Sequence, residues 1–226
     1  MKLYKLTDTG HRPSRRSYDD ACGTAHALDL IGERWALLVM RELMLGPKRF
    51  GDIRADLPGI SANVLTQRLE GLETAGLLVR RRLPPPASTQ VYELTEWGYE
   101  AEPIVRALGR WAARSPAHDP TLPISASSLM LSFKTMFDAK RATGMKARIG
   151  FRIGSESFVA RSAGGRLDIA RGETDGCDLV LTGPAQAIAA SVYGGQPLDA
   201  LALAGDKAVA ERFMTLFPLP AKAGAD

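Results

Sequence analysis

The sequence contains only two cysteines, Cys22 and Cys177, among 226 residues. Two cysteines form at most one disulfide, so a disulfide-rich secreted protein is excluded and a reduced, cytoplasmic setting is expected. Long apolar runs are also missing, since the longest, Trp35 to Met40, is far shorter than the roughly 18 residues that span a bilayer. The first twenty residues carry charges and no apolar core, so we expect no secretory signal and no membrane partner.

Histidine is scarce as well. His11, His26 and His118 have no metal-ligand spacing, and the sequence has no His-Glu-x-x-His, paired Cys-x-x-Cys or phosphate-binding glycine loop. A Ser/His/Asp site can form from residues that are distant in sequence, so the sequence alone does not exclude one. We expect no metal site, no cofactor and no enzymatic activity.

What remains is an ordinary globular composition, with 45% hydrophobic and 24% charged residues. The net charge of +4 permits a polyanionic partner without requiring one. Three prolines between Pro116 and Pro123 cannot continue a helix, which places a domain boundary near residue 117. We therefore expect two domains, residues 1–116 and 117–226.

The first domain is predicted to begin with four helices. Apolar residues recur at helical spacing in four segments, at about residues 24–30, 33–45, 49–57 and 61–75. Gly46-Pro47 is a helix-ending signal, Pro58-Gly59-Ile60 predicts a tight turn, and Ser61 is a suitable N-cap. A short helix, a tight turn and a longer helix are typical of a helix-turn-helix unit.

The last of these helices has the pattern of a DNA-recognition helix. Leu65, Leu69 and Leu72 fall on one side at about 100° per residue, and amide and hydroxyl side chains lie on the other. Asn and Gln can make paired contacts to adenine in the major groove. The candidate DNA-binding residues on this helix are Ser61, Asn63, Thr66, Gln67 and Arg68. A solvated polar helix face is the alternative.

A β-hairpin is predicted directly after this helix. Residues 77–83 and 90–94 are expected to form its strands, so the hairpin would be the wing of a winged helix. Arg80, Arg81 and Arg82 on the first strand are candidates for contact with the DNA backbone. The segment from Lys48 to Arg82 has seven basic and four acidic residues, so its net charge of +3 equals that of the whole first domain.

Several motifs in residues 22–113 match one family in register. They are Ala27–Trp35, Arg49–Ile53, Pro58–Ser61, Leu65–Leu69, Gly76–Leu78 and Tyr92–Gly98. With these motifs the segment resembles the HxlR family of bacterial winged-helix transcriptional regulators, which is related to MarR. The resemblance implies a homodimer that places one winged helix per protomer on adjacent half-sites of double-stranded DNA.

The resemblance also implies which segments form the dimer. Family dimers are built largely from terminal helices, here about residues 24–31 and 96–114. On the second of these helices Ile104, Val105, Leu108 and Trp111 form an apolar stripe at helical spacing. Packing within the protomer is the alternative explanation of this stripe.

Cys22 and Gly23 stand where many family members have Cys-Pro. Because some relatives use a cysteine in this region as a reactive thiol, the resemblance makes Cys22 a candidate redox-sensing residue. Such a role needs an exposed thiol with a lowered pKa. Arg15 and Arg16 are near Cys22 in sequence, but they would lower this pKa only if they are also close in space. The alternative is a plain structural thiol, and Gly23 departs from the family pattern.

The second domain is predicted to have an α+β fold with an antiparallel sheet and packed helices. Helices are expected at residues 125–140, 184–193 and 206–217, with a helical turn at 198–203. Strands are expected at 147–153, 156–163, 166–170 and 177–182. The whole chain is thus predicted to be α+β, with a winged helix-turn-helix domain followed by this layered domain.

Motifs in the second domain resemble the sterol-carrier-protein-like domain. They are Cys177–Pro184, Tyr193-Gly194-Gly195 and Gly205–Lys207. The resemblance implies a hydrophobic cavity between sheet and helices that would take an apolar small molecule. Its candidate lining residues are Leu129, Met130, Phe133, Met136, Phe137, Ile188, Val192 and Phe213. The alternative is that these residues are simply core.

The sequence therefore predicts a homodimeric, sequence-specific DNA-binding transcriptional regulator, with an apolar effector in its C-terminal domain. A different class of protein stays open: an apolar-ligand or lipid carrier whose N-terminal module mainly dimerises.

Overall fold

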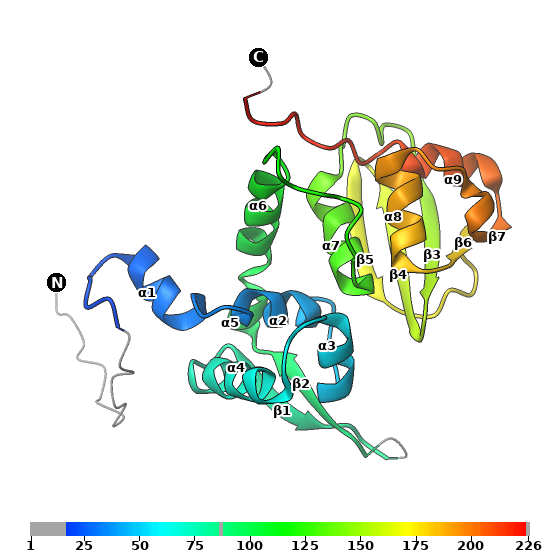
Figure 1. Ribbon diagram of the computed structural model, residues 1–226. Coiled ribbons are helices and arrows are strands. Elements are labelled where there is room, and N and C mark those ends of the chain that lie inside the picture. The colour runs from blue at the N-terminus through cyan, green and yellow to red at the C-terminus, as the bar shows by residue number, and fades with distance from the viewer. Residues whose placement is uncertain (1–16, 86–87, 225–226) are drawn as a thin grey trace, which may run out of the picture.

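The computed structural model describes residues 17–85 and 88–224. Arg15, Arg16, His11 and most of the first twenty residues lie outside the described residues. Figure 1 shows a helical N-terminal part with a β-hairpin and a C-terminal part built on a larger sheet.

The N-terminal part contains the four expected helices. They are α1 (Gly23–Ile31), α2 (Ala36–Leu43), α3 (Phe50–Asp56) and α4 (Ala62–Thr74). The second helix begins three residues later than predicted, because Trp35 adopts a left-handed backbone conformation with φ 81° and thus cannot continue a right-handed helix. Leu43, Leu65 and Leu69 are buried in a common core, which packs α4 against α2.

The β-hairpin lies where the sequence predicts it. Strands β1 (Leu78–Arg82) and β2 (Gln90–Leu94) pair antiparallel, and Lys48 adds two backbone hydrogen bonds to Tyr92. The helix expected at 96–114 is divided into α5 (Glu96–Tyr99) and α6 (Glu102–Ala112). Pro103 stands at the start of α6, where its missing N–H costs no hydrogen bond.

The C-terminal sheet has the order β5-β4-β3-β6-β7. Its strands are β3 (Ala147–Ile153), β4 (Glu156–Ala163), β5 (Arg166–Arg171), β6 (Leu179–Thr182) and β7 (Ala202–Gly205). The prediction of an antiparallel sheet is confirmed for three of its four strand pairs and is wrong for the fourth, because β6 pairs parallel with β3. The loop before β6 crosses β3 at Gly150, where an added Cβ would come within 2.8 Å of the Thr174 side chain. The absence of a side chain at position 150 therefore permits this short crossover.

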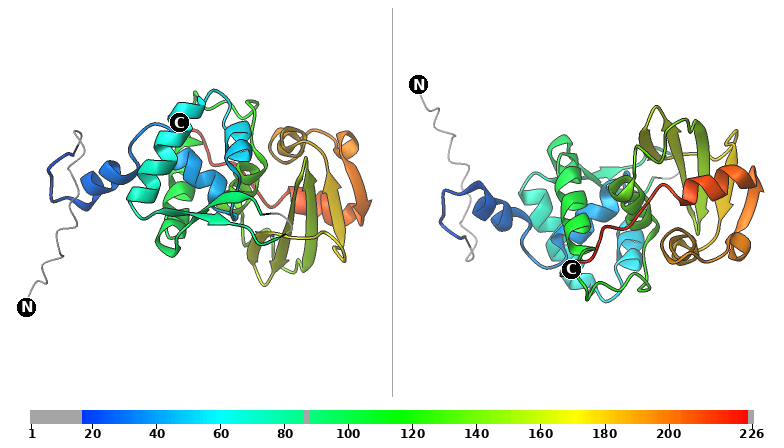
Figure 2. Two further views of the ribbon diagram at one scale, coloured as in Figure 1. Left: turned by 90° about the horizontal axis from the view of Figure 1, so that it is seen from below. Right: turned by 90° about the horizontal axis from the view of Figure 1, so that it is seen from above.

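Three helices cover one face of this sheet (Figures 1 and 2). They are α7 (Ala126–Met136), α8 (Ala185–Gly194) and α9 (Lys207–Met214). Their core is aromatic: the Phe133 ring stacks on Phe217 at 4.6 Å and meets Phe213 edge-on at 5.8 Å. The helical turn predicted at 198–203 is wrong in its second half, because only Leu198–Ala200 is helical and β7 follows as an edge strand.

Helix α7 joins the two parts of the chain. It packs against α6 and α2 of the N-terminal part as well as on the sheet. Leu131 of α7 belongs to the N-terminal core, whereas Leu45 and Ala113 belong to the C-terminal core. Apolar side chains thus cross the proposed boundary near residue 117 in both directions.

Candidate nucleic-acid interface

Helix α4 presents the predicted recognition residues on its exposed side. The Ser61 hydroxyl caps the helix by accepting a hydrogen bond from the Val64 N–H at 3.2 Å. Because Leu65, Leu69 and Leu72 are buried, the helix cannot rotate without exposing them. Asn63, Thr66 and Gln67 are consequently brought together on the solvent side. Ser61, in contrast, is used at least partly as a structural cap.

Arg68 is placed differently from its neighbours on α4. Its side chain is half-buried, and its guanidinium Nη2 lies 3.2 Å from the Glu33 carboxylate. Glu33 lies before α2, so the pair ties the recognition helix to the rest of the N-terminal core. In this arrangement Arg68 braces the helix and does not project freely from it.

The three wing arginines are exposed, and each has a partner within the domain. Arg80 pairs with Glu73 at 2.8 Å and lies over the Tyr92 ring, and Arg81 pairs with Glu93 at 2.6 Å. Arg82 donates from Nε to the Ser88 carbonyl at 3.2 Å, across the hairpin. A phosphate would therefore have to compete with Glu73 and Glu93 for the first two arginines.

Sequence reasoning missed these two carboxylates as partners. The hairpin register could have indicated Glu93. Arg81 stands opposite Val91, and Glu93 lies two residues further along the partner strand. A long side chain reaches such a diagonal neighbour. The net charge of +3 between Lys48 and Arg82 omits Glu93. The wing is therefore less positive than that count indicates.

The residues predicted to line an apolar pocket lie mostly in the C-terminal core. Five are completely buried and pack together with the sheet: Leu129, Met130, Phe133, Ile188 and Phe213. Phe137 and Val192 are partly buried against the same core. Of the eight, Met136 alone is among the residues around the large cavity described below, which lies between the two parts of the chain. The sequence missed this cavity because most of its walls come from other segments.

Cys22 is the N-cap residue of α1 and is exposed. The backbone N–H groups of Ala25 and Thr24 at the start of the helix lower the pKa of the Cys22 thiol below its ordinary value. Cys177 is half-buried beside Gly150. Cys22 thus combines exposure with a lowered pKa, and its redox-sensing role stays a prediction.

We expect Cys22 to be alkylated faster than Cys177 when the folded protein is treated with iodoacetamide near neutral pH, because a lowered pKa raises the thiolate fraction and exposure admits the reagent. Peptide mass spectrometry at timed intervals measures both rates in one sample, with Cys177 as the internal control. Equal rates in folded protein would contradict an activated Cys22 thiol. In urea the two rates should converge.

Within residues 17–85 and 88–224 no group of three or more His, Cys, Asp or Glu side chains could hold a metal ion. None of the helices in that part of the chain is both long and apolar enough to cross a membrane.

Comparison with known proteins places the N-terminal part in a family. The HxlR-like helix-turn-helix family matches residues 30–119. An uncharacterized HTH-type transcriptional regulator from Synechocystis sp. is 39% identical over 87 residues, which are 38% of this chain and 64% of that protein, slightly less than two thirds of its length. The uncharacterized HTH-type transcriptional regulator YvaP from Bacillus subtilis is 36% identical over 86 residues, 38% of this chain and 80% of that protein.

A solved structure, the reduced form of the transcriptional regulator YodB from B. subtilis, is 34% identical and covers 43% of this chain and 98% of that chain, with a TM-score of 0.39. The family match ends at residue 119, so the resemblance of the C-terminal part to sterol-carrier proteins stays a prediction. On the match of residues 30–119 and the identity to YvaP, the chain belongs to the HxlR-like helix-turn-helix family of transcriptional regulators.

Proposed function

We propose that this protein is a sequence-specific DNA-binding transcriptional regulator that acts as a homodimer. The observation that carries the proposal is the exposed polar side of α4, which presents Asn63, Thr66 and Gln67. The wing beside it bears three arginines, and the chain belongs to the HxlR-like helix-turn-helix family. An α-helix fits the major groove, where amide side chains read base edges. The wing arginines contribute affinity that does not depend on sequence.

Helix α6 supports the homodimer. None of its residues is buried, and three of its apolar side chains are strongly exposed: Ile104 at 52%, Leu108 at 49% and Trp111 at 74%. Val105, the fourth residue of the predicted stripe, packs against the N-terminal core instead. Helix α1 also has no buried residue and projects from the rest of the molecule in each view (Figures 1 and 2). Exposed apolar stripes of this kind are typical of interaction surfaces, and we propose that a second copy covers them.

We also propose that an apolar small molecule modulates DNA binding. The packing of α7 on both α2 and the sheet supports this, because a change in the C-terminal part would be transmitted to the helix-turn-helix unit. A pure apolar-ligand carrier would show no specific DNA complex. DNA binding therefore separates the two classes of function.

The DNA proposal is tested by two substitutions with different expected results. A preferred site is first selected from random duplex DNA with the wild-type protein. Gln67→Ala is then expected to lose about 1–3 kcal/mol of discrimination at one base position. Arg81→Ala is expected to weaken binding to all sequences about equally and to reduce the slope of log K against log salt by about 1.

The measurement is fluorescence anisotropy with selected and scrambled duplexes at several salt concentrations. Glu93→Gln is the matched control for Arg81→Ala, since it frees the same arginine from the carboxylate 2.6 Å away and should strengthen binding to both duplexes. If wild type and Gln67→Ala prefer the same bases to the same degree, α4 is not the reading helix. If wild type binds no duplex, the DNA-binding proposal fails.

A further inference from the structure

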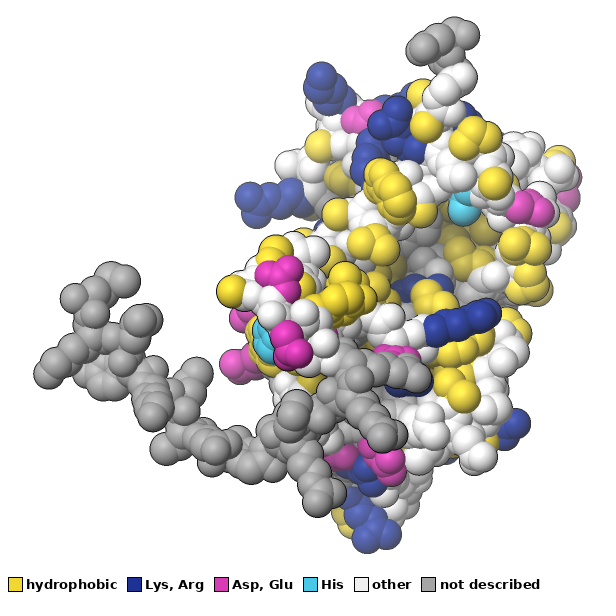
Figure 3. Space-filling view, turned by 60° about the vertical axis from the view of Figure 1, so that its left-hand side comes forward, with side chains coloured by type: hydrophobic (Ala, Val, Ile, Leu, Met, Phe, Trp, Pro, Cys, Tyr) yellow, Lys and Arg dark blue, Asp and Glu magenta, His cyan; other side chains and the backbone are white. Residues whose placement is uncertain are grey.

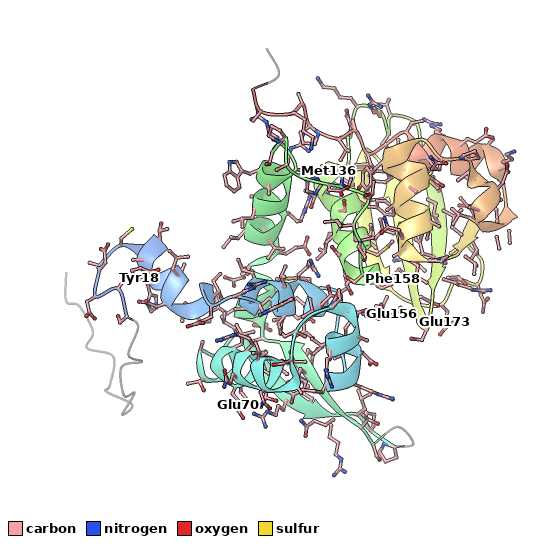
Figure 4. The ribbon with its side chains drawn as sticks, in the orientation of Figure 1. Tyr18, Glu70, Met136, Glu156, Phe158 and Glu173 are labelled. Atoms are coloured by element: carbon pink, nitrogen blue, oxygen red, sulfur yellow. The ribbon has the colours of Figure 1, made fainter. Side chains whose placement is uncertain are left out.

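A cavity of about 610 Å³ lies between the two parts of the chain. Figure 3 shows hydrophobic side chains gathered around the hollow on this face of the molecule. Its walls come from α2, α6, the linker at 117–124, α7, α8 and Leu219 of the C-terminal tail. Met136, the last residue of α7, lines it on the side of α7 that faces α6 (Figure 4). The volume is within the range of small-molecule sites, roughly 300–1,000 Å³.

The cavity is mainly apolar and has polar groups along one helix. Leu37, Val105 and Leu131 provide apolar surface from three different helices. Ser128, Ser132 and Thr135 lie at i, i+4 and i+7 on α7 and therefore face the cavity together. The Ser132 hydroxyl is bonded to the Tyr193 hydroxyl at 2.6 Å, so this polar strip is fixed in place.

The cavity wall carries charges of both signs, because Arg41, Arg106 and Asp119 are among its lining residues. Along the contact between α6 and α7, the Glu102 carboxylate pairs with Lys134 at 2.6 Å and with Arg106 at 3.3 Å, while Arg110 donates to the Thr135 carbonyl and the Met136 sulfur. Two cations thus share one carboxylate. With Arg110 the three cations exceed the carboxylates of Glu102 and Asp119 by one positive charge. Arg41, the other arginine on the cavity wall, is neutralised by Glu42 at 2.7 Å.

One donor in this group has no acceptor. Arg106 uses Nη1 on Glu102 and Nη2 on the Lys134 carbonyl, but its Nε–H is buried and has no hydrogen-bond partner among the described residues. This Nε presents no accessible surface to the cavity, but the Arg106 side chain as a whole is 36% exposed and lines the cavity. An anion in the cavity would therefore meet the guanidinium group and offset the positive charge beside it.

From these observations we infer that the cavity binds a small apolar organic acid, with its anionic group at Arg106 and its apolar body against Leu37, Val105 and Leu131. Since α2 belongs to the helix-turn-helix core and α7 to the C-terminal domain, occupancy changes how the two parts pack. The proposal of a binding site depends only on the cavity, whereas the proposed effect of the ligand on DNA binding rests on the function proposed above.

The experiment titrates the full chain with anilinonaphthalene sulfonate, an apolar anion, and with N-phenyl-1-naphthylamine, the same ring system without the sulfonate. Both probes fluoresce when they leave water. We expect saturable binding of one probe per chain, with the sulfonate bound more tightly. Arg106→Met should weaken sulfonate binding about tenfold or more and change amine binding less than about twofold.

A second variant fills the cavity from its wall. A Cβ at Gly109 would meet no atom within 4 Å, and leucine is a better helix residue than glycine, so Gly109→Leu should block both probes without unfolding the protein. Gly51→Leu is the matched control, because a Cβ at this exposed glycine of α3 would also meet no atom within 4 Å and Gly51 does not line the cavity. Circular dichroism and thermal melts check that each variant folds.

Unchanged probe binding by folded Gly109→Leu overturns the site, as does an equal loss of binding in folded Gly51→Leu. Equal effects of Arg106→Met on both probes overturn the acid assignment. In a separate arm, saturating sulfonate probe should change the DNA affinity of wild type by about fivefold or more and leave that of Gly109→Leu unchanged. Absence of any wild-type DNA complex would refute the DNA-binding proposal. The probe titrations would still show whether the cavity binds an apolar acid.

Discussion

Replacing Lys48 by methionine is expected to lower the free energy of unfolding by about 3–5 kcal/mol, because it removes one partner of a buried ion-pair network. The Lys48 side chain is 2% exposed, and its Nζ lies 3.1 Å from Glu42 and 3.2 Å from Glu156 and also pairs with Asp56. Methionine fills a similar volume without the charge. The expected loss is therefore electrostatic and not a cavity effect.

The network joins the two parts of the chain. The fully buried Glu42 on α2 accepts hydrogen bonds from Arg41 and, at 2.8 Å, from the Ser125 hydroxyl at the start of α7. Glu156 begins β4 and lies where the sheet approaches α2 and α3 (Figure 4). With Asp56 and Arg171 the cluster has three carboxylates and three cations, so removing one cation leaves an uncompensated buried negative charge.

The pH dependence of the variant follows from Asp56. Burial raises the pKa of Asp56, and its hydrogen bond and attraction to Lys48 oppose that rise. Without Lys48 this pKa should rise further. A carboxyl whose folded pKa exceeds its unfolded value costs stability above that pKa, and the cost disappears as the pH falls through it. Lys48→Met should therefore regain stability to a greater extent than wild type as the pH falls from neutral into the acid range.

Wild type should also lose the contribution of Lys48 at alkaline pH. Burial lowers the pKa of Lys48, but Glu42, Asp56 and Glu156 outweigh burial and leave the pKa above its ordinary value. Its stabilising contribution is thus complete below the unfolded pKa and is lost as the pH rises through the folded one. Urea unfolding at several pH values measures both effects.

Lys140→Met is the control for loss of a positive charge, since Lys140 is exposed. This control should change the free energy of unfolding by no more than about 0.5 kcal/mol. An equally small change in Lys48→Met would show that the network does not stabilise the fold. Adding Glu42→Gln to Lys48→Met should recover part of the lost stability, because it removes a buried carboxylate left without its cation.

Features that depend on short segments were predicted well from the sequence. The Ser61 cap, the strands 147–153 and 156–163 and the buried side of α4 all follow from periodicity and turn residues within about ten positions. The exposed position of Asn63 and Gln67 follows from the same pattern, because Leu65 and Leu69 determine which side of the helix is buried.

Features that depend on long-range contact could not be predicted. Lys48 and Glu156 are 108 positions apart, and no local pattern indicates that a lysine beside a helix end will be buried by a strand from another domain. The parallel pairing of β6 depends on a crossover at Gly150, which looks like any strand glycine in the sequence. The cavity is likewise a product of how α6 packs on α7.

Replacing both Leu108 and Trp111 by aspartate is expected to convert a wild-type dimer into a monomer. These side chains are exposed at 49% and 74% on α6, so their replacement removes apolar contact area and places like charges opposite each other across a symmetric interface. Because neither side chain is buried within the protomer, the fold itself should be retained. Light scattering after size exclusion should give about twice 24.3 kDa for wild type and 24.3 kDa for the double variant.

The same double variant should bind a paired half-site about 100-fold more weakly than wild type, because each winged helix then binds without the raised effective concentration that its partner provides. Binding to a single half-site should change little, since α4 and the wing are untouched. Ser155→Asp, in the exposed turn between β3 and β4, is the control for a new surface charge and should stay dimeric. A wild-type protein that is monomeric at micromolar concentration would contradict the dimer, and the Gln67→Ala comparison would then have to be made on single half-sites.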